Sequence, residues 1–520
     1  MHVIAPIHRI PVEALAHIFC CVLQPGGQKP SPHRERTPPA LLLRSICRRW
    51  RAVAEDTSSL WPDIVGRHGF EWTRRALSWS KECSLNIHLC DISYGQYRDK
   101  RMTDWDASVA LVIAEIHRAR SIAIECEPVY TPLVRQALRS ALRRLETLDV
   151  RYIDALDASS LAGEVPTRLK DLALAGITAP LGCPALMAPL TSLHVCECII
   201  WASMDELLCT LSNLPNLENF EWTQFIPTQA YTFLIPPLHA STESRPKLIL
   251  LARLRTIYVR TCVECITYLL THIASPNSCN VTVDAYIETS GSEDMDQLLP
   301  ALDSAFGKSL RAAFPISDER EGYQSLTIDG FEGYMSEGMT FIWTKPTAIT
   351  APTCFHLGFL PAHDSDGQAS PILLVIAEHI LDHWTVTHRA LSHLRLVHPT
   401  FYDIIDPESP EPQGRPWSRI LRLLQSLEHL EAHHNVCGLG DALTLGSSGI
   451  TNPHLQRIDI QEASLSEGEF FDLINSIRMS NSYFYQHGSV RRSRILRLLD
   501  CDVEDTPIEL TVGQPGKAIA

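Results

Sequence analysis

The chain has 520 residues, of which 45% are hydrophobic and 20% are charged, the composition of a folded protein too long for one compact core. Its 60 Asp and Glu residues against 45 Lys and Arg give a net charge of −15. This balance argues against a general nucleic-acid binder, whose surface needs clustered cations. We therefore expect several domains or one solenoid, and no nucleic acid among the partners.

No stretch of about 18 consecutive apolar residues occurs, so we expect no transmembrane helix and no membrane partner. The N-terminus does not match a signal peptide, because His8, Arg9, Glu13 and His17 interrupt its apolar stretch. The expected location is therefore cytoplasmic and/or nuclear. In that setting the 16 cysteines stay reduced and behave as small buried hydrophobes.

Residues 7–65 have a helical pattern of their own. Pro11 suits the first position of a helix, and apolar residues follow at helical spacing from Leu15 to Val22. Residues 24–40 are rich in Pro, Gly and charge and predict an exposed loop. A second helix is expected from Leu42 to Val53. Capping residues 56–59 then begin a short turn that carries Leu60 and Trp61.

From about residue 110 the apolar residues recur with the six-residue spacing L-x-x-L-x-L. Its clearest copies span 119–124, 145–150, 169–174, 190–195, 217–222, 254–259, 391–396 and 455–460. The early copies are 26, 24, 21, 27 and 37 residues apart, close to the range of about 20–29 residues of leucine-rich repeats. Alternate apolar residues of each copy would point inward from a short strand, and the segments between the copies are expected to be helical, for example residues 205–214 and 375–387.

The repeats are irregular. The asparagine that follows the strand in regular leucine-rich repeats is missing from most copies, and the spacing nearly fails between residues 285 and 370. There, residues 325–330 and 353–359 each predict a strand. We divide the chain into a helical module (7–65), a connecting segment (66–110), an irregular repeat domain (111–504) and a tail expected to be flexible (505–520). The expected fold class is α/β, with short parallel strands and helices in a solenoid.

The N-terminal pattern resembles the F-box. The matching elements are Ile10-Pro11-Val12-Glu13-Ala14-Leu15, then Ile18-Phe19, then Ile46-Cys47-Arg48-Arg49-Trp50-Arg51, and finally Leu60-Trp61. The loop at 24–40 is longer than in compact F-boxes and is similar to the F-box-like variant of large fungal families, in which similar repeats follow. A longer surface loop adds little entropy cost, so the helices can still pack together.

The resemblance implies that the helical module binds a Skp1-type adaptor, and through it a cullin–RING ligase, while the repeats bind a protein client. The chain would then be a substrate-recognition subunit of an SCF-type ubiquitin ligase. The alternative is a leucine-rich-repeat scaffold protein that takes no part in ubiquitination. The adaptor-facing residues implied are Ile10, Pro11, Leu15, Ile18, Phe19, Ile46, Cys47, Trp50, Leu60 and Trp61. A module of this size cannot bury so many large side chains internally, which favours binding over a purely structural role.

The client is expected on solvent-facing strand residues, because successive repeats align them into one wall. The candidates are Asp149, Arg151, Glu197, Glu221, Arg260 and His433. Acidic residues dominate the wider set of exposed strand positions in the N-terminal half, which would favour a basic partner.

We expect no catalytic site, no metal and no cofactor. Phosphate-binding glycine loops and nucleophile elbows are missing from the sequence. An enzyme with a metal site stays open as a third class, since histidines at favourable spacing occur at His379 and His383 and again at His429, His433, His434 and Cys437. Cys262 and Cys265 form a C-x-x-C without a second pair, and we expect buried thiols at the start of a helix.

Overall fold

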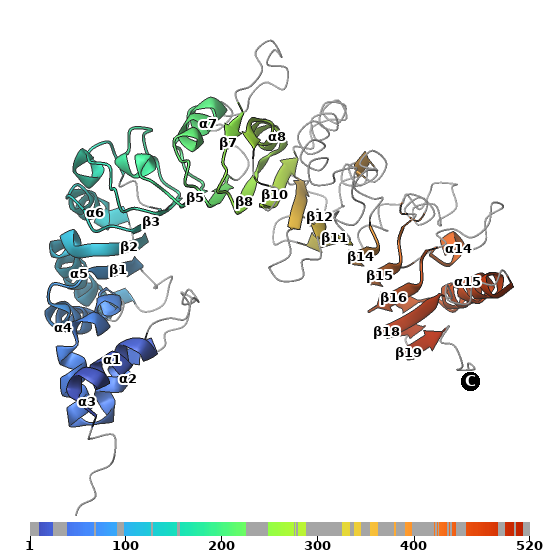
Figure 1. The fold of residues 1–520 in the computed structure, drawn as a ribbon, viewed down its shortest axis with the longest axis horizontal. Helices are drawn as coiled ribbons and strands as arrows, with labels where there is room; N and C mark the ends of the chain where they lie inside the picture. The colour runs from blue at the N-terminus through green and yellow to red at the C-terminus, as the bar shows by residue number, and fades with distance from the viewer. Residues whose placement is uncertain are drawn as a thin grey trace, which may run out of the picture. The chain divides into compact units, whose positions relative to one another are not determined.

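The structure is a computed structural model in which the chain forms two compact units, residues 1–221 and 222–520. We describe each unit by itself. The architecture is mixed α/β with mostly parallel strands (Figure 1). The structure describes residues 10–23, 39–66, 69–90, 98–125, 128–152, 156–224, 248–274, 276, 279–287, 325–332, 337–344, 354–361, 379–380, 391–397, 421, 424, 426–433, 436, 439–443, 454–486, 494–503 and 506–512.

Unit 1 begins with packed helices. They are α1 (Val12–Leu23), α2 (Pro39–Ile46), α3 (Arg48–Asp56), η2 (Ser58–Leu60) and η3 (Pro62–Ile64). The single helix expected from Leu42 to Val53 is wrong, because it is divided at Cys47. That residue is extended, and its Sγ accepts a hydrogen bond from the backbone N–H of Trp50 at 3.4 Å, so it caps a new helix.

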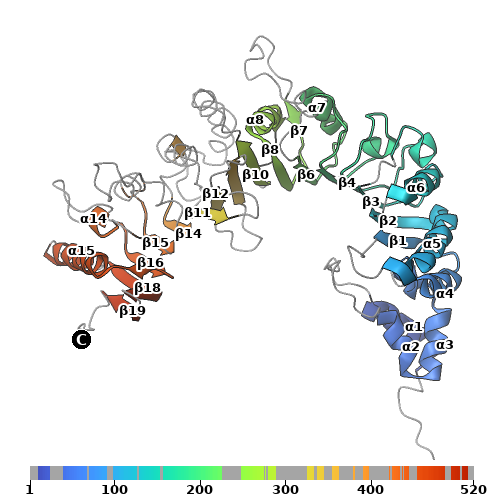
Figure 2. The ribbon, with the colours of Figure 1, turned by 180° about the vertical axis from the view of Figure 1, so that it is seen from behind.

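The remaining elements of unit 1 alternate between helix and strand. They are α4 (Phe70–Ser80), β1 (Leu85–Cys90), α5 (Arg98–Ala114), η4 (Ile116–Arg118), β2 (Ala119–Glu125), η5 (Pro128–Tyr130), α6 (Thr131–Leu138), β3 (Thr147–Arg151), η6 (Ser160–Gly163), β4 (Asp171–Ala175), η7 (Pro184–Met187), β5 (Ser192–Cys196), α7 (Met204–Ser212) and β6 (Asn219–Thr223). Strands β1 to β5 pair in chain order and are all parallel. Helices α5 and α6 lie on one side of these strands in both views (Figures 1 and 2).

The repeated apolar spacing predicts the strands of unit 1 correctly. Ile122, Leu148, Leu172 and Leu193 are in register on β2 to β5, and each is fully buried. The segment 66–110, in contrast, is more than a connection, because it holds α4 and β1, and α5 crosses residue 110. β1 is the first strand of the sheet and pairs with β2.

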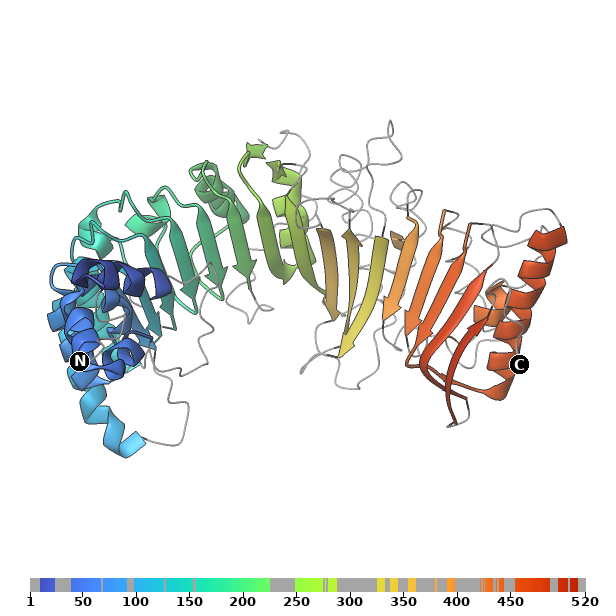
Figure 3. The same cartoon turned by 60° about the horizontal axis from the view of Figure 1, so that its bottom comes forward.

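Unit 2 contains β8 (Thr256–Cys262), α8 (Val263–His272), β10 (Asn280–Ile287), β11 (Ser325–Glu332), β12 (Glu337–Thr344), β13 (Cys354–Pro361), β14 (His393–Val397), β15 (His429–His433), α14 (Leu439–Leu443), β16 (Arg457–Gln461), β17 (Ser464–Leu465), α15 (Glu467–Gln486), β18 (Ile495–Val503) and β19 (Thr506–Val512), and a two-stranded sheet of β7 (Ile249–Leu250) and β9 (Ile273–Ala274). Figure 3 shows the strands β14, β15, β16, β18 and β19 side by side, and α15 packs against β18.

An antiparallel meander interrupts the chain order of the strands in unit 2. β10 pairs with β13, β13 with β12, β12 with β11, and β11 with β14. The strands expected near 325–330 and 353–359 are present as β11 and β13. β12 was missed, because Phe341 and Trp343 alternate on an antiparallel strand that lacks the preceding leucine of the repeat.

The tail beyond residue 504 was expected to be flexible, and over Thr506–Val512 this is wrong. These residues form β19, which pairs antiparallel with β18. The alternation in Pro507-Ile508-Glu509-Leu510 is short and follows polar Asp502 and Glu504, which hides the strand in the sequence. Residues 24–38 of the loop predicted at 24–40, most of the helix at 375–387 and residues 513–520 lie outside the described residues. The end of the predicted loop is wrong, because Pro39 and Ala40 begin α2.

Candidate binding surfaces

Four of the ten adaptor-facing candidates form the core of the helical module. Leu15, Phe19, Leu60 and Trp61 are buried, with Trp61 fully so. The indole Nε1–H of Trp61 donates a hydrogen bond to the carbonyl of Ala54 at 2.8 Å. In this conformation these four side chains are buried within the helical module.

The other candidates stay at least partly accessible. Pro11, Ile18 and Ile46 are exposed, and Ile10, Cys47 and Trp50 are half-buried. Trp50 covers Phe19, with ring centroids 4.9 Å apart. Three further apolar side chains were not among the candidates, although helical spacing places two of them in the apolar stripes of their helices: Val12, Val22 and Leu42. Their exposed fractions distinguish these residues from the core residues, whereas their spacing in the sequence alone does not.

We define the module surface as the five exposed apolar side chains Val12, Ile18, Val22, Leu42 and Ile46, which are 43–66% exposed. The structure describes 17 exposed large hydrophobic side chains, so this surface holds five of them on α1 and α2, helices of 12 and 8 residues. The helix α1 packs against α2 and α3, so these side chains belong to one small module. An apolar concentration of this kind is typical of an interaction site.

Three of the four client candidates of unit 1 lie on its strands, at positions that alternate with buried residues. Arg151 donates from Nε and Nη2 to the carboxylate of Asp149 at 2.9 and 3.0 Å, along one strand. Glu221 lies 2.6 Å from Nδ1 of His194 on β5. Glu197 follows β5 with a φ of 52°, so it ends the strand and does not continue its solvent face. The structure thus places Asp149, Arg151 and Glu221 on strands, as predicted, but in separate pairs.

The candidate Arg260 belongs to unit 2. It faces Asp284 on the neighbouring strand β10, with Nε 3.8 Å from Oδ2, and the hydroxyl of Tyr258 donates to the same carboxylate at 2.9 Å. Gly358 is in register with Asp284, and a Cβ at this glycine would collide with the carboxylate. The glycine therefore makes room for Asp284 beside it.

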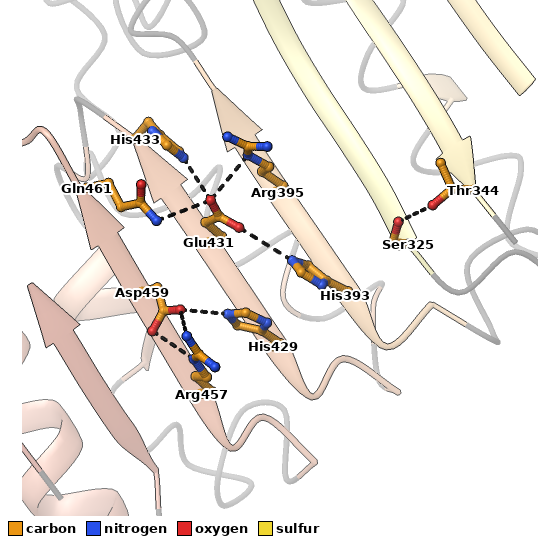
Figure 4. A network of polar contacts seen from close by, with 10 residues as sticks. All are labelled: Ser325, Thr344, His393, Arg395, His429, Glu431, His433, Arg457, Asp459 and Gln461. Carbon is orange, nitrogen blue, oxygen red and sulfur yellow. Dashed lines mark hydrogen bonds and ion pairs between the residues drawn. The ribbon is translucent and has the colours of Figure 1, made fainter. Parts of the chain in front are cut away.

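The most extensive polar network of the described residues lies on β14, β15 and β16, and it includes the last candidate, His433 (Figure 4). Its centre is Glu431 on β15. The carboxylate oxygen Oε1 lies 3.0 Å from Nε2 of His433 and 3.2 Å from Nε of Arg395, and Nε2 of Gln461 donates to it at 3.3 Å. The other oxygen lies 3.7 Å from Nε2 of His393.

The second half of this network is built on Asp459 of β16. Arg457 donates from Nε to Oδ1 at 2.9 Å, and Nε2 of His429 lies 3.0 Å from Oδ2. The rings of His393 and His429 are 4.2 Å apart between centroids, which joins the two halves. The Asp459 side chain is only 4% exposed and that of Glu431 16%, whereas those of Arg395 and Arg457 are 46% and 42% exposed. The carboxylates therefore lie beneath the arginines. We call these residues together the β14–β16 network.

The network keeps its carboxylates ionised. Burial raises the pKa of Glu431, but the hydrogen bond from His433 and the charge of Arg395 outweigh it, and the pKa falls below its ordinary value. The pKa of Asp459 is likewise lowered, because the hydrogen bonds from Arg457 and His429 outweigh burial. His393 differs: burial, and then the proximity of His429, lower its pKa. Its imidazole is therefore neutral at pH 7.

We expect unit 2 to lose stability as the pH falls. His393 has a lowered pKa in the folded protein, so the unfolded chain binds the extra proton first, and stability decreases below about pH 6.5. Glu431 and Asp459 also have lowered values, so their contribution is complete above about pH 4.5 and is lost as the pH falls further. Urea denaturation at a series of pH values measures both steps, and a His393→Asn variant should remove only the first.

The metal alternative finds no geometric support in the part of the chain that the structure describes, where no group of three or more His, Cys, Asp or Glu side chains is arranged to hold a metal ion. His383, His434 and Cys437 lie outside that part. Cys262 and Cys265 are at the start of α8, as expected, with Cys265 buried and its pKa raised by its contact with Cys262 and by burial. None of the described helices is long and apolar enough to cross a membrane.

Comparison with known proteins adds no family to these observations. No protein-family model and no curated protein matches the chain. The function therefore has to be argued from the two surfaces, the apolar one of the helical module and the polar one of the strands.

Proposed function

We propose that this protein is a non-catalytic recognition subunit, in which the helical module is an F-box-like domain that docks a Skp1-type adaptor and the strands and helices form an irregular leucine-rich-repeat solenoid that holds a protein client. Through the adaptor the client would reach a cullin–RING ubiquitin ligase. The observation that carries the proposal is the module surface, because five large apolar side chains stay in water although the module has a packed core of Leu15, Phe19 and Trp61.

The core residues fit the same proposal in a different role. They set the angles between α1, α2 and α3, and so they hold the exposed side chains in place. Ile18 and Val22 are one helical turn apart on α1, as are Leu42 and Ile46 on α2, so each helix offers a short apolar row. Rows of this kind suit a partner with an apolar groove or helix face.

The test is adaptor capture by the full-length protein. Ile18→Asp and Leu42→Asp place a charge in the proposed contact, and each should weaken capture at least about 30-fold, as expected for a residue at the centre of an interface. Both positions are exposed, by 43% and 54%, so the fold should be retained. Binding is measured by surface plasmon resonance against purified Skp1-type adaptor.

The matched control is Leu133→Asp on α6, where the leucine is 47% exposed but is not part of the module surface. It should leave adaptor binding unchanged. Wild-type protein that captures no adaptor, or a Leu133→Asp variant that loses as much as Ile18→Asp, would overturn the proposal. Capture of the adaptor without cullin-dependent turnover of any client would instead favour the scaffold alternative.

A further inference from the structure

The arrangement of charge in the β14–β16 network is layered. Two carboxylates lie at the level of the sheet, and above them the guanidinium groups of Arg395 and Arg457 reach solvent. A third arginine, Arg497 on β18, is in register with Asp459 and half-buried. Three arginines against two carboxylates give a formal excess of one positive charge, in a protein whose net charge is −15.

The carboxylates fix the arginines and do not consume all of their donors. Arg395 uses Nε on Glu431, and Arg457 uses Nε and Nη2 on Asp459. A guanidinium has five N–H donors, so these contacts leave each arginine with further donors, and the two side chains are 46% and 42% exposed. Because their partners already hold the side chains, an incoming anion would order them at little further entropic cost.

We infer that the β14–β16 network is a binding site for an acidic peptide segment, whose carboxylates pair with Arg395 and Arg457. This inference rests on the proposed function, in which the strands and helices hold a protein client. It adds the chemical class of that client. The two arginines lie on strands separated by β15 and are offset by two residues in register, so their backbones are about 12 Å apart. Donors spread over three strands suit several carboxylates of an extended chain better than one small ion.

His393 makes the site dependent on pH. His393 faces His429, Glu431 and Arg395, and His429 faces Asp459, Arg457 and His393. His433 faces Glu431. Acidic Glu462 directly follows β16, and Asp500 lies within β18, where its φ is 53°. A bound carboxylate adds negative charge beside His393 and favours its protonation, which burial and His429 otherwise oppose, so binding of an acidic peptide should strengthen as the pH falls below about 6.5.

The test uses the full-length protein and a fluorescein-labelled hexaglutamate peptide, with fluorescence anisotropy at low salt. The expected result is binding that weakens with added salt, and that Arg395→Gln or Arg457→Gln reduces by about tenfold, the value of one charge-assisted hydrogen bond. Arg139→Gln is the matched control, since this arginine has a similar exposure of 53% and pairs with Asp157 in unit 1. It should leave the affinity unchanged.

Three outcomes overturn the inference: no binding of hexaglutamate by the wild-type protein, equal loss in Arg139→Gln, or tighter binding of a single-stranded oligonucleotide than of the peptide. Thermal melting of each variant excludes unfolding as the cause. The two proposals fail separately, because Arg395→Gln should still capture the adaptor and Ile18→Asp should still bind the peptide.

Discussion

Replacing Trp61 with alanine is expected to lower the free energy of unfolding of unit 1 by about 3–5 kcal/mol, the range for a buried aromatic residue. Trp61 is fully buried, its ring centroid is 4.4 Å from that of Trp79, and its Nε1–H bonds to the carbonyl of Ala54. The variant loses the packing and leaves that carbonyl without this donor. Guanidinium denaturation followed by circular dichroism measures the loss.

Two further variants separate core packing from adaptor contact. Trp72→Ala removes a tryptophan of α4 that is only half-buried, beside Arg44 and Arg75, and it should cost much less. Trp61→Phe keeps most of the ring volume and should preserve adaptor capture, because Trp61 faces the core. A Trp61→Phe variant that stays as stable as the wild type yet loses the adaptor would show that Trp61 is a contact residue after all.

Replacing Asp459 with alanine is expected to destabilise unit 2 by about 2–3 kcal/mol. The carboxylate is nearly buried and accepts charge-assisted hydrogen bonds from Arg457, with His429 on its other side. Its removal leaves His429 and Arg457 without their shared acceptor. Urea denaturation of the full chain should show the change in the transition of unit 2 alone.

Asp149→Ala is the matched control for this prediction. Asp149 also accepts two hydrogen bonds from an arginine of its own strand, but its side chain is 25% exposed and that of Arg151 is 48% exposed. A pair in water contributes less than about 1 kcal/mol. Equal losses in the two variants would mean that burial of Asp459 adds nothing to the strength of its contacts.

The strands that follow a leucine at fixed spacing could be predicted from the sequence. Leu145 before β3 and Leu455 before β16 are fully buried, and the alternate residues that follow them point into the core. The spacing marks the residues that are buried on one face of a strand, and each of these parallel strands buries such a face. The first helix could be predicted for the same reason, since Leu15 and Phe19 are one turn apart.

What the sequence could not supply was pairing between distant segments. β12 and β19 pair antiparallel with their neighbours, and neither has the leucine that marks a repeat. The break at Cys47 depends on a thiol that caps the next helix, which spacing does not reveal. The contacts within the β14–β16 network could not be predicted either, because those of Glu431 and Asp459 arise from the register of three strands.

The meander in unit 2 has a consequence for how the chain accommodates insertions. β13 is parallel to β10 and β11 is parallel to β14, so three strands occupy the space between two neighbours of the same direction. The core-facing residues also stay aligned, from Val283 through Leu357, Phe341 and Ile328 to Leu396. Because the meander has three strands, an odd number, β14 has the same direction as β10 and its buried residues lie on the same face of the sheet. The β11–β13 segment can therefore stand between β10 and β14 without changing the direction of β14 relative to β10. The chain continues after it as if β14 paired with β10 directly.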